Sequence, residues 1–268
     1  GAVQSAADPC FYILRDGKAW VKCLVYVDDF AITYNDRRLY DRMWKALSDV
    51  LEVTDFGKLR LFLGIMVERD VAGTVTLSQR QYISQATASL GVAASTGVGP
   101  RSPMRPGREG KLRRAEDSEV LPEGSVPYKQ AVGCLFWLAR GTRWDIAYAV
   151  GQVAKYMERP SAAHWSAVLR IWYYLLSTKD LSLPMGPSGG ERNNLKLWAH
   201  SDSDWAGDID TRRSRTGWLV FIGGAAVAWR SNLQGCHALS ATEAEYVAMG
   251  DVAKEVVWWR RLFEDMCW

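Results

Sequence analysis

The stretch that most constrains the fold is Leu24–Tyr34, which reads LVYVDDFAITY and places two neighbouring carboxylates, Asp28 and Asp29, inside an apolar run. β-branched and aromatic residues dominate its flanks, and such a run predicts a buried or half-buried strand. Two adjacent charges are costly to bury without a partner, and a divalent cation suits carboxylate oxygens. A hairpin turn at the Asp pair is the alternative, because Asp is a common turn residue. The residues alone leave both interpretations open.

Composition indicates a globular protein. The 268 residues suggest one large or two ordinary domains, and 48% hydrophobic with 24% charged residues suffice for a core. A formal net charge of +3 permits nucleic-acid binding at a local patch without arguing for it. There is no signal peptide and no apolar run of about 18 residues, so no membrane partner is expected. The five cysteines form no CxxC pair, which favours reduced thiols in an intracellular protein.

The sequence pattern of the first third of the chain predicts strands and a helix. Apolar residues recur every four positions after a cap at Asn35 or Asp36, which predicts a helix with one apolar face: Leu39, Met43, Leu47 and Leu51. Thr54–Asp70 predicts a turn and a strand, followed by a short hairpin through Ala72-Gly73. Residues 91–127, rich in Gly, Pro, Ser and charge, predict a solvated linker, with a phosphate-contacting arm as the alternative.

The remainder predicts helices and then a second set of strands. Helices dominate from Tyr128 to Thr178, with Ser161 as a cap and His164 as a helix-packing side chain. Strands follow near 195–202, 217–222 and 226–230 as an antiparallel sheet, with a hairpin turn at Gly223-Gly224. A helix over residues 242–264 is expected on one face of this sheet, with surplus aromatic surface from Trp258, Trp259, Phe263 and Trp268.

The stretch Tyr26-Val27-Asp28-Asp29 resembles the YxDD box of reverse transcriptases. In that family the box is the turn of a palm hairpin, and its carboxylates hold the two metals of nucleotidyl transfer. The resemblance therefore implies that the hairpin turn and the metal site are the same structural element.

Further motifs resemble copia-type (Ty1/copia) retrotransposon Pol polyproteins, in that family's order. FGKLRLFLGI is similar to the primer grip, and Leu77–Leu90 resembles the helix that starts the thumb. YKQAVGCLFWLARGTRWDI resembles the connection, although Trp144 stands where the family usually shows proline. SDSDWAGDIDTRRSRTGWLVFIGG and ALSATEAEYVAM resemble its ribonuclease H.

The resemblance implies an α+β fold of several parts. It places a partial reverse-transcriptase palm and thumb start in residues 1–90, a linker in 91–127 and a helical connection in 128–180. A partial ribonuclease H-like sheet with one helix occupies residues 190–268.

The resemblance also implies the site residues. Asp28 and Asp29 correspond to polymerase carboxylates, and Asp202 and Glu243 to ribonuclease H carboxylates; all four are expected to be catalytic and to bind Mg²⁺. In the parent protein the partners would be an RNA template and an RNA–DNA hybrid. Each family site uses a further acid on a segment expected before Gly1 or after Trp268, so both sites are expected to be incomplete, with weak or absent Mg²⁺ binding.

Two functions therefore stay open. One is a fragment of an RNA-directed DNA polymerase with ribonuclease H. The other is a co-opted, non-catalytic binding or structural subunit of a larger assembly. In either case the first strand of the ribonuclease H-like sheet would leave an edge that recruits another protein or a second copy. The expected location is intracellular, in a cytoplasmic particle or the nucleus.

Overall fold

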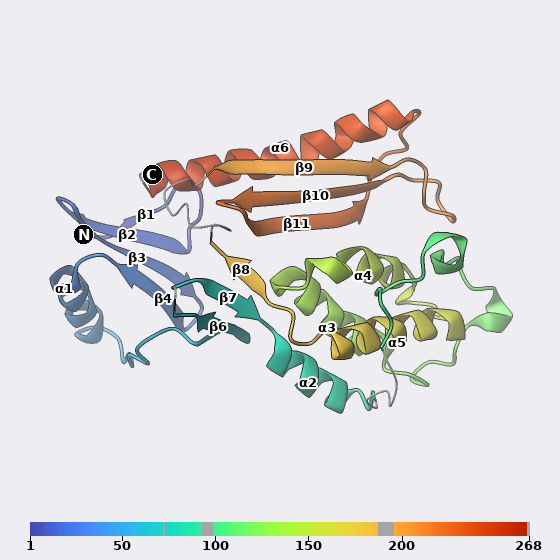
Figure 1. Ribbon diagram of the computed structural model, residues 1–268, viewed down its shortest axis with the longest axis horizontal. Coiled ribbons are helices and arrows are strands. Elements are labelled where there is room, and N and C mark those ends of the chain that lie inside the picture. Colours follow the sequence, from blue (N-terminus) through green and yellow to red (C-terminus); the bar gives the residue numbers. More distant parts are fainter. Residues whose placement is uncertain (72, 93–98, 187–195, 267–268) are drawn as a thin grey trace. The chain divides into compact units, whose positions relative to one another are not determined.

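The computed structural model describes residues 1–71, 73–92, 99–186 and 196–266. They form two compact units, one of Gly1–Leu63 with Lys254–Trp268 and one of Gly64–Ala253. Helices are combined with antiparallel strands in both, which confirms the predicted mixture of the two (Figure 1). Within the described residues, no helix is both long enough and apolar enough to cross a membrane.

The first unit contains an antiparallel sheet whose strands follow one another in chain order: β1 (Val3–Gln4), β2 (Phe11–Asp16), β3 (Ala19–Tyr26) and β4 (Asp29–Tyr34). Helix α1 (Arg37–Ser48) follows, and the short strand β5 (Leu61–Phe62) comes later. Val21 of β3 packs with Leu39 and Tyr40 of α1 in a small buried cluster. This cluster holds the sheet and the helix together.

Helix α1 begins where the sequence predicts. The Asp36 carboxylate accepts a hydrogen bond from the Leu39 N–H at 2.8 Å, so Asp36 is the N-cap. Four residues later, the Tyr40 hydroxyl donates to the Asp55 carboxylate at 2.8 Å. Burial, helped by this hydrogen bond, raises the pKa of Tyr40 to about 12.

The C-terminal part of helix α6 (Ala241–Asp265) belongs to the first unit. The Trp258 indole donates to the Ala7 carbonyl at 2.9 Å, and the Ser5 hydroxyl donates to Asp265 at 2.5 Å. The predicted surplus of exposed aromatic surface is wrong for the described residues, because Trp258, Trp259 and Phe263 are half-buried. Trp268 lies outside the described residues.

The second unit starts with three neighbouring antiparallel strands and a helix: β6 (Ile65–Arg69), β7 (Val75–Ser78), β8 (Leu183–Met185) and α2 (Arg80–Ser89). The β6–β7 hairpin confirms the predicted one, with Ala72 outside the described residues. Helix α2 begins at Arg80 rather than at the predicted Leu77. Leu77 pairs instead with Val67 and Leu183, because the sheet supplies it with two neighbours.

A helical core occupies the middle of the second unit. Its elements are α3 (Tyr128–Gly141), η3 (Trp144–Ile146), α4 (Ala147–Val153), η4 (Ala154–Tyr156) and α5 (Ala162–Ser177). The segment between α3 and α5 is thus a short α-helix with a tighter 3₁₀ turn at each end. Leu135, Ile171 and Trp172 are fully buried at its centre. Burial of such side chains is the main source of stability for helices of this length.

His164 packs inside this core, as predicted. The Ser161 N–H donates to its Nδ1 at 2.9 Å, and its Nε2 lies 2.8 Å from the Arg113 carbonyl oxygen. Its ring stacks on Tyr156 with centroids 4.0 Å apart. Burial lowers the pKa of His164, so the neutral ring completes the cap of α5.

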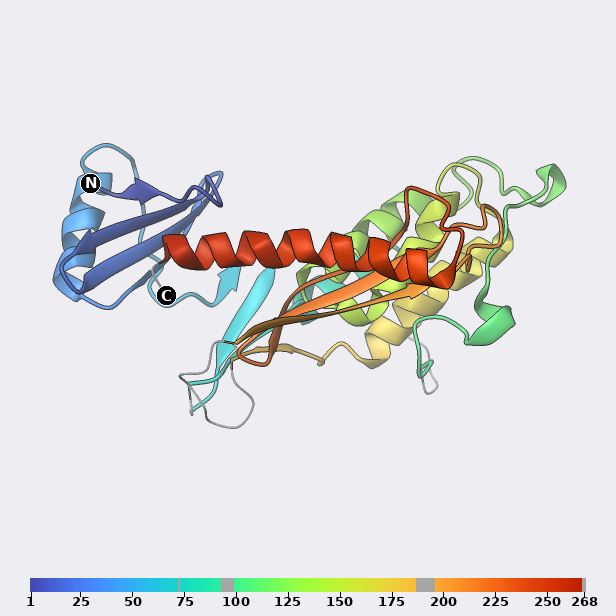
Figure 2. The same cartoon turned by 90° about the horizontal axis from the view of Figure 1, so that it is seen from above.

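A third sheet ends the second unit, in the order β11-β10-β9: β9 (Leu197–Asp204), β10 (Arg215–Ile222) and β11 (Ala225–Leu233). Its antiparallel pairing confirms the prediction, although Leu195 lies outside the described residues. Gly223 and Gly224 form the turn with φ of +56° and +86°, values that favour glycine. Helix α6 follows as one continuous helix (Figure 2).

Candidate active site

Asp28 and Asp29 lie at the tip of the β3–β4 hairpin. Tyr26 pairs with Asp29, so Val27 and Asp28 alone form the turn. Both carboxylates are exposed. The prediction of a tight hairpin turn between antiparallel strands is confirmed, and it places two acids side by side in solvent.

The turn contains a strained residue. Val27 has φ of +54° and its side chain is 81% exposed. A β-branched residue with positive φ is an outlier, and hairpins with positive φ only at the first turn residue normally have glycine there. Strain of this kind is found most often at functional sites. The backbone therefore singles out the same tip that the carboxylates do.

Asp202 lies on the exposed face of β9. Side chains along this strand alternate between half-buried and exposed, and Asp202 shares the exposed side with Trp198 and His200. Trp198 stacks on Phe221 of β10 with centroids 4.1 Å apart. Within the described part of the chain, the Asp202 carboxylate forms no hydrogen bond or ion pair.

Glu243 has a different environment, in the first turn of α6. Its carboxylate accepts a hydrogen bond from the Leu239 N–H at 2.7 Å, and its own N–H donates to the Ser240 hydroxyl at 3.1 Å. These reciprocal bonds satisfy backbone groups at the start of the helix. Glu243 thus has a capping role that its position alone explains.

The acid of α6 that reaches β9 is Glu245, which is not among the residues predicted from the sequence to form the site. Its carboxylate accepts from the Ser203 N–H at 3.4 Å. The E-A-E spacing offers two acids in the same turn, and only the packing of the helix distinguishes their roles.

The four predicted site residues fall into different units. Asp28 and Asp29 belong to the first, and Asp202 and Glu243 to the second. In the described ranges, no group of three or more His, Cys, Asp or Glu side chains is arranged to hold a metal ion. Their catalytic roles and the binding of Mg²⁺ therefore stay predictions.

A cavity of about 310 Å³ lies inside the second unit, between the β9–β11 sheet and the η3–α4 segment. We call it the Asp202 cavity, and its main lining side chains are Trp144, Tyr148, His200, Asp202, Leu219 and Trp229. The Trp229 indole is fixed by donating to the Ala139 carbonyl at 2.6 Å. The departure at Trp144 from the family pattern was the one sequence signal for this cavity.

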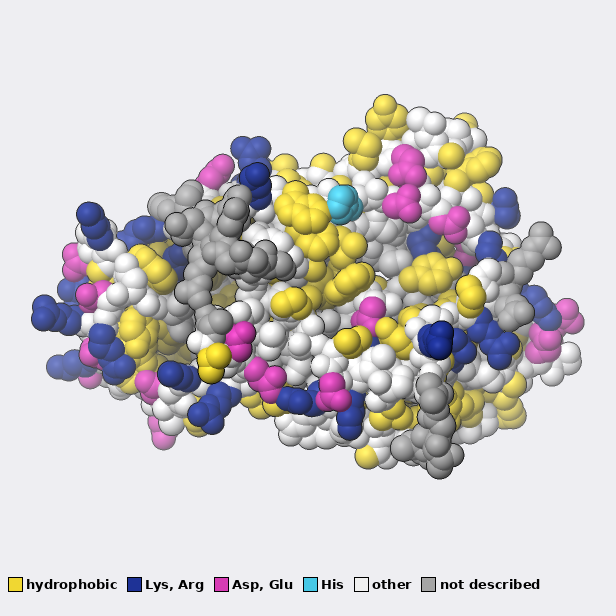
Figure 3. Space-filling view, in the orientation of Figure 1, with side chains coloured by type: hydrophobic (Ala, Val, Ile, Leu, Met, Phe, Trp, Pro, Cys, Tyr) yellow, Lys and Arg dark blue, Asp and Glu magenta, His cyan; other side chains and the backbone are white. Residues whose placement is uncertain are grey.

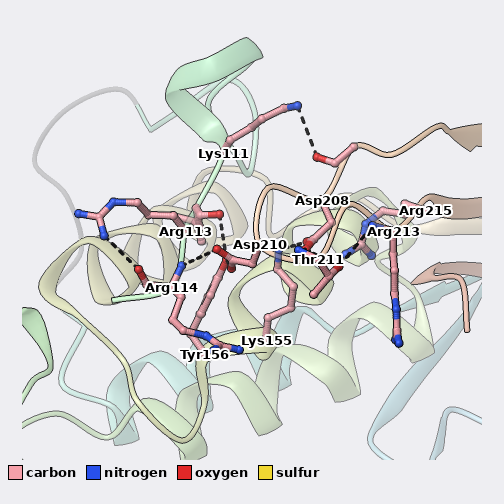
Figure 4. A network of polar contacts seen from close by, with 12 residues as sticks. Lys111, Arg113, Arg114, Lys155, Tyr156, Asp208, Asp210, Thr211, Arg213 and Arg215 are labelled. Atoms are coloured by element: carbon pink, nitrogen blue, oxygen red, sulfur yellow. Dashed lines mark hydrogen bonds and ion pairs between the residues drawn. The ribbon is translucent and has the colours of Figure 1, made fainter. Parts of the chain in front are cut away.

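A polar network fixes the β9–β10 loop to the helical core (Figure 4). Asp208 is almost fully buried and pairs with Lys155, while the Thr211 hydroxyl donates to it at 2.8 Å. Burial acts to raise the pKa of Asp208, but the hydrogen bonds from Lys155 and Thr211 outweigh it, and the pKa is lowered. No local sequence pattern indicates this pair, because Lys155 and Asp208 are far apart in the chain.

The same network holds part of the predicted linker. The Arg114 N–H donates to Asp210 at 2.9 Å, and the Lys111 ammonium donates to the Gly207 carbonyl at 3.4 Å (Figure 4). The Tyr156 hydroxyl lies 2.8 Å from the Leu112 carbonyl oxygen. Residues 111–114 are therefore held to the second unit by hydrogen bonds, while the side chains of Lys111, Arg113 and Arg114 stay exposed to solvent.

Comparison with known proteins gives matches along almost the whole chain. The family model described as "Reverse transcriptase (RNA-dependent DNA polymerase)" matches residues 3–104. The Retrovirus-related Pol polyprotein from transposon TNT 1-94 of Nicotiana tabacum is 34% identical over 98% of this chain, and that from transposon RE1 of Arabidopsis thaliana is 36% identical over 96%. The chain covers 20% and 17% of these two proteins, so it spans about a fifth of their length.

A shorter relative has nearly the same extent. The uncharacterized mitochondrial protein AtMg00810 of Arabidopsis thaliana is 31% identical over 88% of this chain, and the match covers 92% of that protein. No solved structure gives a significant match.

Proposed function

This chain belongs to the family of copia-type retrotransposon Pol polyproteins, and on that premise we propose that it contributes part of an RNA-directed DNA polymerase with ribonuclease H. Residues 1–90 would be part of the palm with the start of the thumb, and residues 128–180 the connection. Residues 190–268 would be part of the ribonuclease H domain. We further propose that these 268 residues by themselves carry incomplete sites.

The observation that carries the proposal is the exposed Asp28–Asp29 pair at the strained tip of the β3–β4 hairpin. Carboxylate oxygens are the ligands that Mg²⁺ prefers, so the donor set fits this ion. Bound there, Mg²⁺ would supply charge stabilisation for phosphoryl transfer. The side chains of Asp28 and Asp29 would hold it, with water completing the shell. Mg²⁺ sheds its waters reluctantly, so two carboxylates are expected to bind it weakly.

In the ribonuclease H part, Asp202 and Glu243 are the proposed carboxylates. Asp202 supports this role because it is exposed and makes no ion pair within the described residues. The Glu243 carboxylate accepts a hydrogen bond from the Leu239 N–H at 2.7 Å, and this bond would have to break before the carboxylate could bind a metal. This competition is a further reason to expect weak binding of Mg²⁺ there.

Primer extension tests the polymerase part. The purified chain, a primed RNA template and Mg²⁺ should give no extended product. Extension that disappears in Asp28→Asn would contradict the proposed incompleteness.

Mn²⁺ titration followed by NMR line broadening tests metal binding by the Asp28–Asp29 pair directly. Line broadening should begin at residues next to Asp28 and Asp29 and be lost in the variant with both residues changed to Asn. Asp49→Asn, an exposed acid at the end of α1, is the matched control.

A non-catalytic subunit is the second candidate function. It is favoured by the match that covers 92% of AtMg00810, because a protein of similar extent exists under its own name. Strand β9 is the natural contact, since it lies at one edge of the β11-β10-β9 sheet of the described residues. Another protein, or a second copy, would pair along it. Light scattering that shows a monomer at micromolar concentration would count against self-pairing.

A further inference from the structure

Aromatic side chains line the Asp202 cavity from two sides. Trp144 and Tyr148 are four residues apart across η3 and α4, a spacing that brings side chains onto one face. Trp229 comes from β11 in the sheet, and its indole is fixed by its hydrogen bond to Ala139. Hydrophobic side chains gather on the molecular face over this sheet (Figure 3). A ligand in the cavity would therefore meet aromatic rings from both the helical and the sheet side.

The floor of the cavity is open at a glycine. Gly217 of β10 pairs with Asp202 on one side and Ser231 on the other. Apart from Gly217 and its two chain neighbours, no atom of the described residues lies within 4 Å of the position that a Cβ on Gly217 would take. Along the same face, Leu219 pairs with Trp229 and adds apolar surface. A small apolar group can therefore enter beside the Asp202 carboxylate.

One negative charge is available in this cavity. The other lining acid, Asp145, accepts from the Arg143 guanidinium at 2.9 and 2.7 Å and from the Tyr174 hydroxyl at 2.8 Å. Asp202 is exposed and, in the described ranges, forms neither a hydrogen bond nor an ion pair. The electrostatic attraction of the cavity is thus for a cation.

Two arginines have to be considered. Arg230 is among the residues that line the cavity, but it follows Trp229 in β11, and because successive side chains of a strand point to opposite faces, its guanidinium is directed away from the face that carries Trp229. The Arg215 guanidinium lies 5.4 Å from the Tyr148 ring centroid. Burial acts most strongly on Arg215 and lowers its pKa, while Tyr148, Asp208 and Asp204 act to raise it. Asp204 is also its partner across the strands. Asp202 forms no ion pair with Arg215 in the described residues.

We propose that the Asp202 cavity binds a methylated ammonium group of the kind carried by trimethyllysine. Aromatic faces attract cations, and quaternary ammonium groups are recognised by aromatic rings in this way. A trimethylammonium group has no N–H donor, so contact with apolar walls leaves no hydrogen bond of the ligand unsatisfied. The ammonium of lysine has three donors, and the cavity offers one free carboxylate to accept them. The proposal goes beyond the proposed polymerase function and needs neither Mg²⁺ nor nucleic acid.

Fluorescence polarisation with labelled peptides tests this binding on the full chain, in EDTA so that no metal competes for Asp202. A peptide with one trimethyllysine should bind about tenfold or more tightly than the same peptide with lysine. A peptide with the neutral tert-butyl isostere should be weaker by a similar factor, since it has the shape without the charge. Choline should displace the trimethyllysine peptide. Comparison of the dissociation constants of choline and of the trimethyllysine peptide then shows whether the preferred ammonium group belongs to a protein or to a small molecule.

Variants test the named residues. Trp144→Ala and Asp202→Asn should each weaken binding about tenfold, and Trp144→Phe should weaken it less, because Trp is the strongest cation–π partner. Trp205→Ala and Glu123→Gln are the controls: both side chains are exposed and neither lines the cavity. Trp144→Phe and Asp202→Asn change little volume, so they remain informative if Trp144→Ala does not fold.

Three results would overturn the proposal. The neutral isostere could bind as tightly as the trimethyllysine peptide, which would make the cavity merely apolar. Trp144→Phe and Asp202→Asn could both bind the peptide as the unchanged chain does. AMP could displace the peptide at lower concentration than choline, which would assign the aromatic rings to base stacking.

Discussion

The Lys155–Asp208 ion pair allows a prediction in which the two partners are not equivalent. The Asp208 side chain is 1% exposed and that of Lys155 is 16% exposed. Removing one partner of a buried pair leaves the other charge buried, which costs about 3–5 kcal/mol when no water can reach it. A lysine at the edge of the core can extend its ammonium to solvent, whereas a buried carboxylate cannot. The cost therefore depends on which partner is removed.

We expect Lys155→Met to lower the free energy of unfolding by about 3 kcal/mol, because the buried Asp208 carboxylate keeps its hydrogen bonds from Thr211 and the nearby charge of Arg215 but loses its ion pair. Asp208→Asn should cost about 1–2 kcal/mol, since the amide oxygen still accepts from Thr211 and Lys155 can reach water. Asp41→Asn is the control. Its pair with Arg37 is 56% and 66% exposed, and its loss should cost less than about 0.5 kcal/mol.

Urea denaturation followed by circular dichroism measures these differences. The pH dependence gives a second test. The pKa of Asp208 is lowered in the folded chain, so the stability that it contributes is present above its unfolded pKa of about 3.9 and is lost as pH falls through the folded pKa. The gap between the unchanged chain and Lys155→Met should therefore shrink below about pH 4. Equal costs for Lys155→Met and Asp208→Asn, or a gap independent of pH, would refute the reasoning.

Three further predictions follow from single residues. Val27→Gly should raise the free energy of unfolding by about 1 kcal/mol in urea denaturation, because glycine relieves the strain at φ +54°; an unchanged or lower value would contradict that strain. Ser161→Ala should lower it by about 1 kcal/mol, because the Ser161 hydroxyl no longer accepts from the His164 N–H, and a neutral result would show that this hydroxyl bond adds nothing. The Cys23 thiol should react far more slowly than the exposed Cys10 with a thiol reagent at about pH 8, because burial raises the pKa of Cys23 to about 11; equal labelling by mass spectrometry would argue against its burial.

Local patterns of the sequence were enough to predict where α1 and α5 begin. Asp36 and Ser161 cap these two helices as expected, whereas for Asp28-Asp29 the residues offered a turn as one of two interpretations, which the resemblance to reverse transcriptases favoured. Each of these features depends on residues a few positions apart, whose preferences are set by their own backbone and side chains. Gly223-Gly224 specifies the β10–β11 turn in the same way.

Only the tertiary structure decided which distant segments pack together and which of their side chains become buried or paired. Leu77 became a strand residue because β8 pairs beside it, and Asp208 became buried because Lys155 reaches it from η4. The Asp202 cavity likewise needs Trp144 from one segment and the open space over Gly217 from another. Burial and charge pairing depend on contacts across the chain, which no local preference encodes. For this reason the resemblance in the sequence predicted Asp202 and Glu243 as a pair, whereas in the folded chain Glu243 caps helix α6 and Asp202 lines an aromatic cavity.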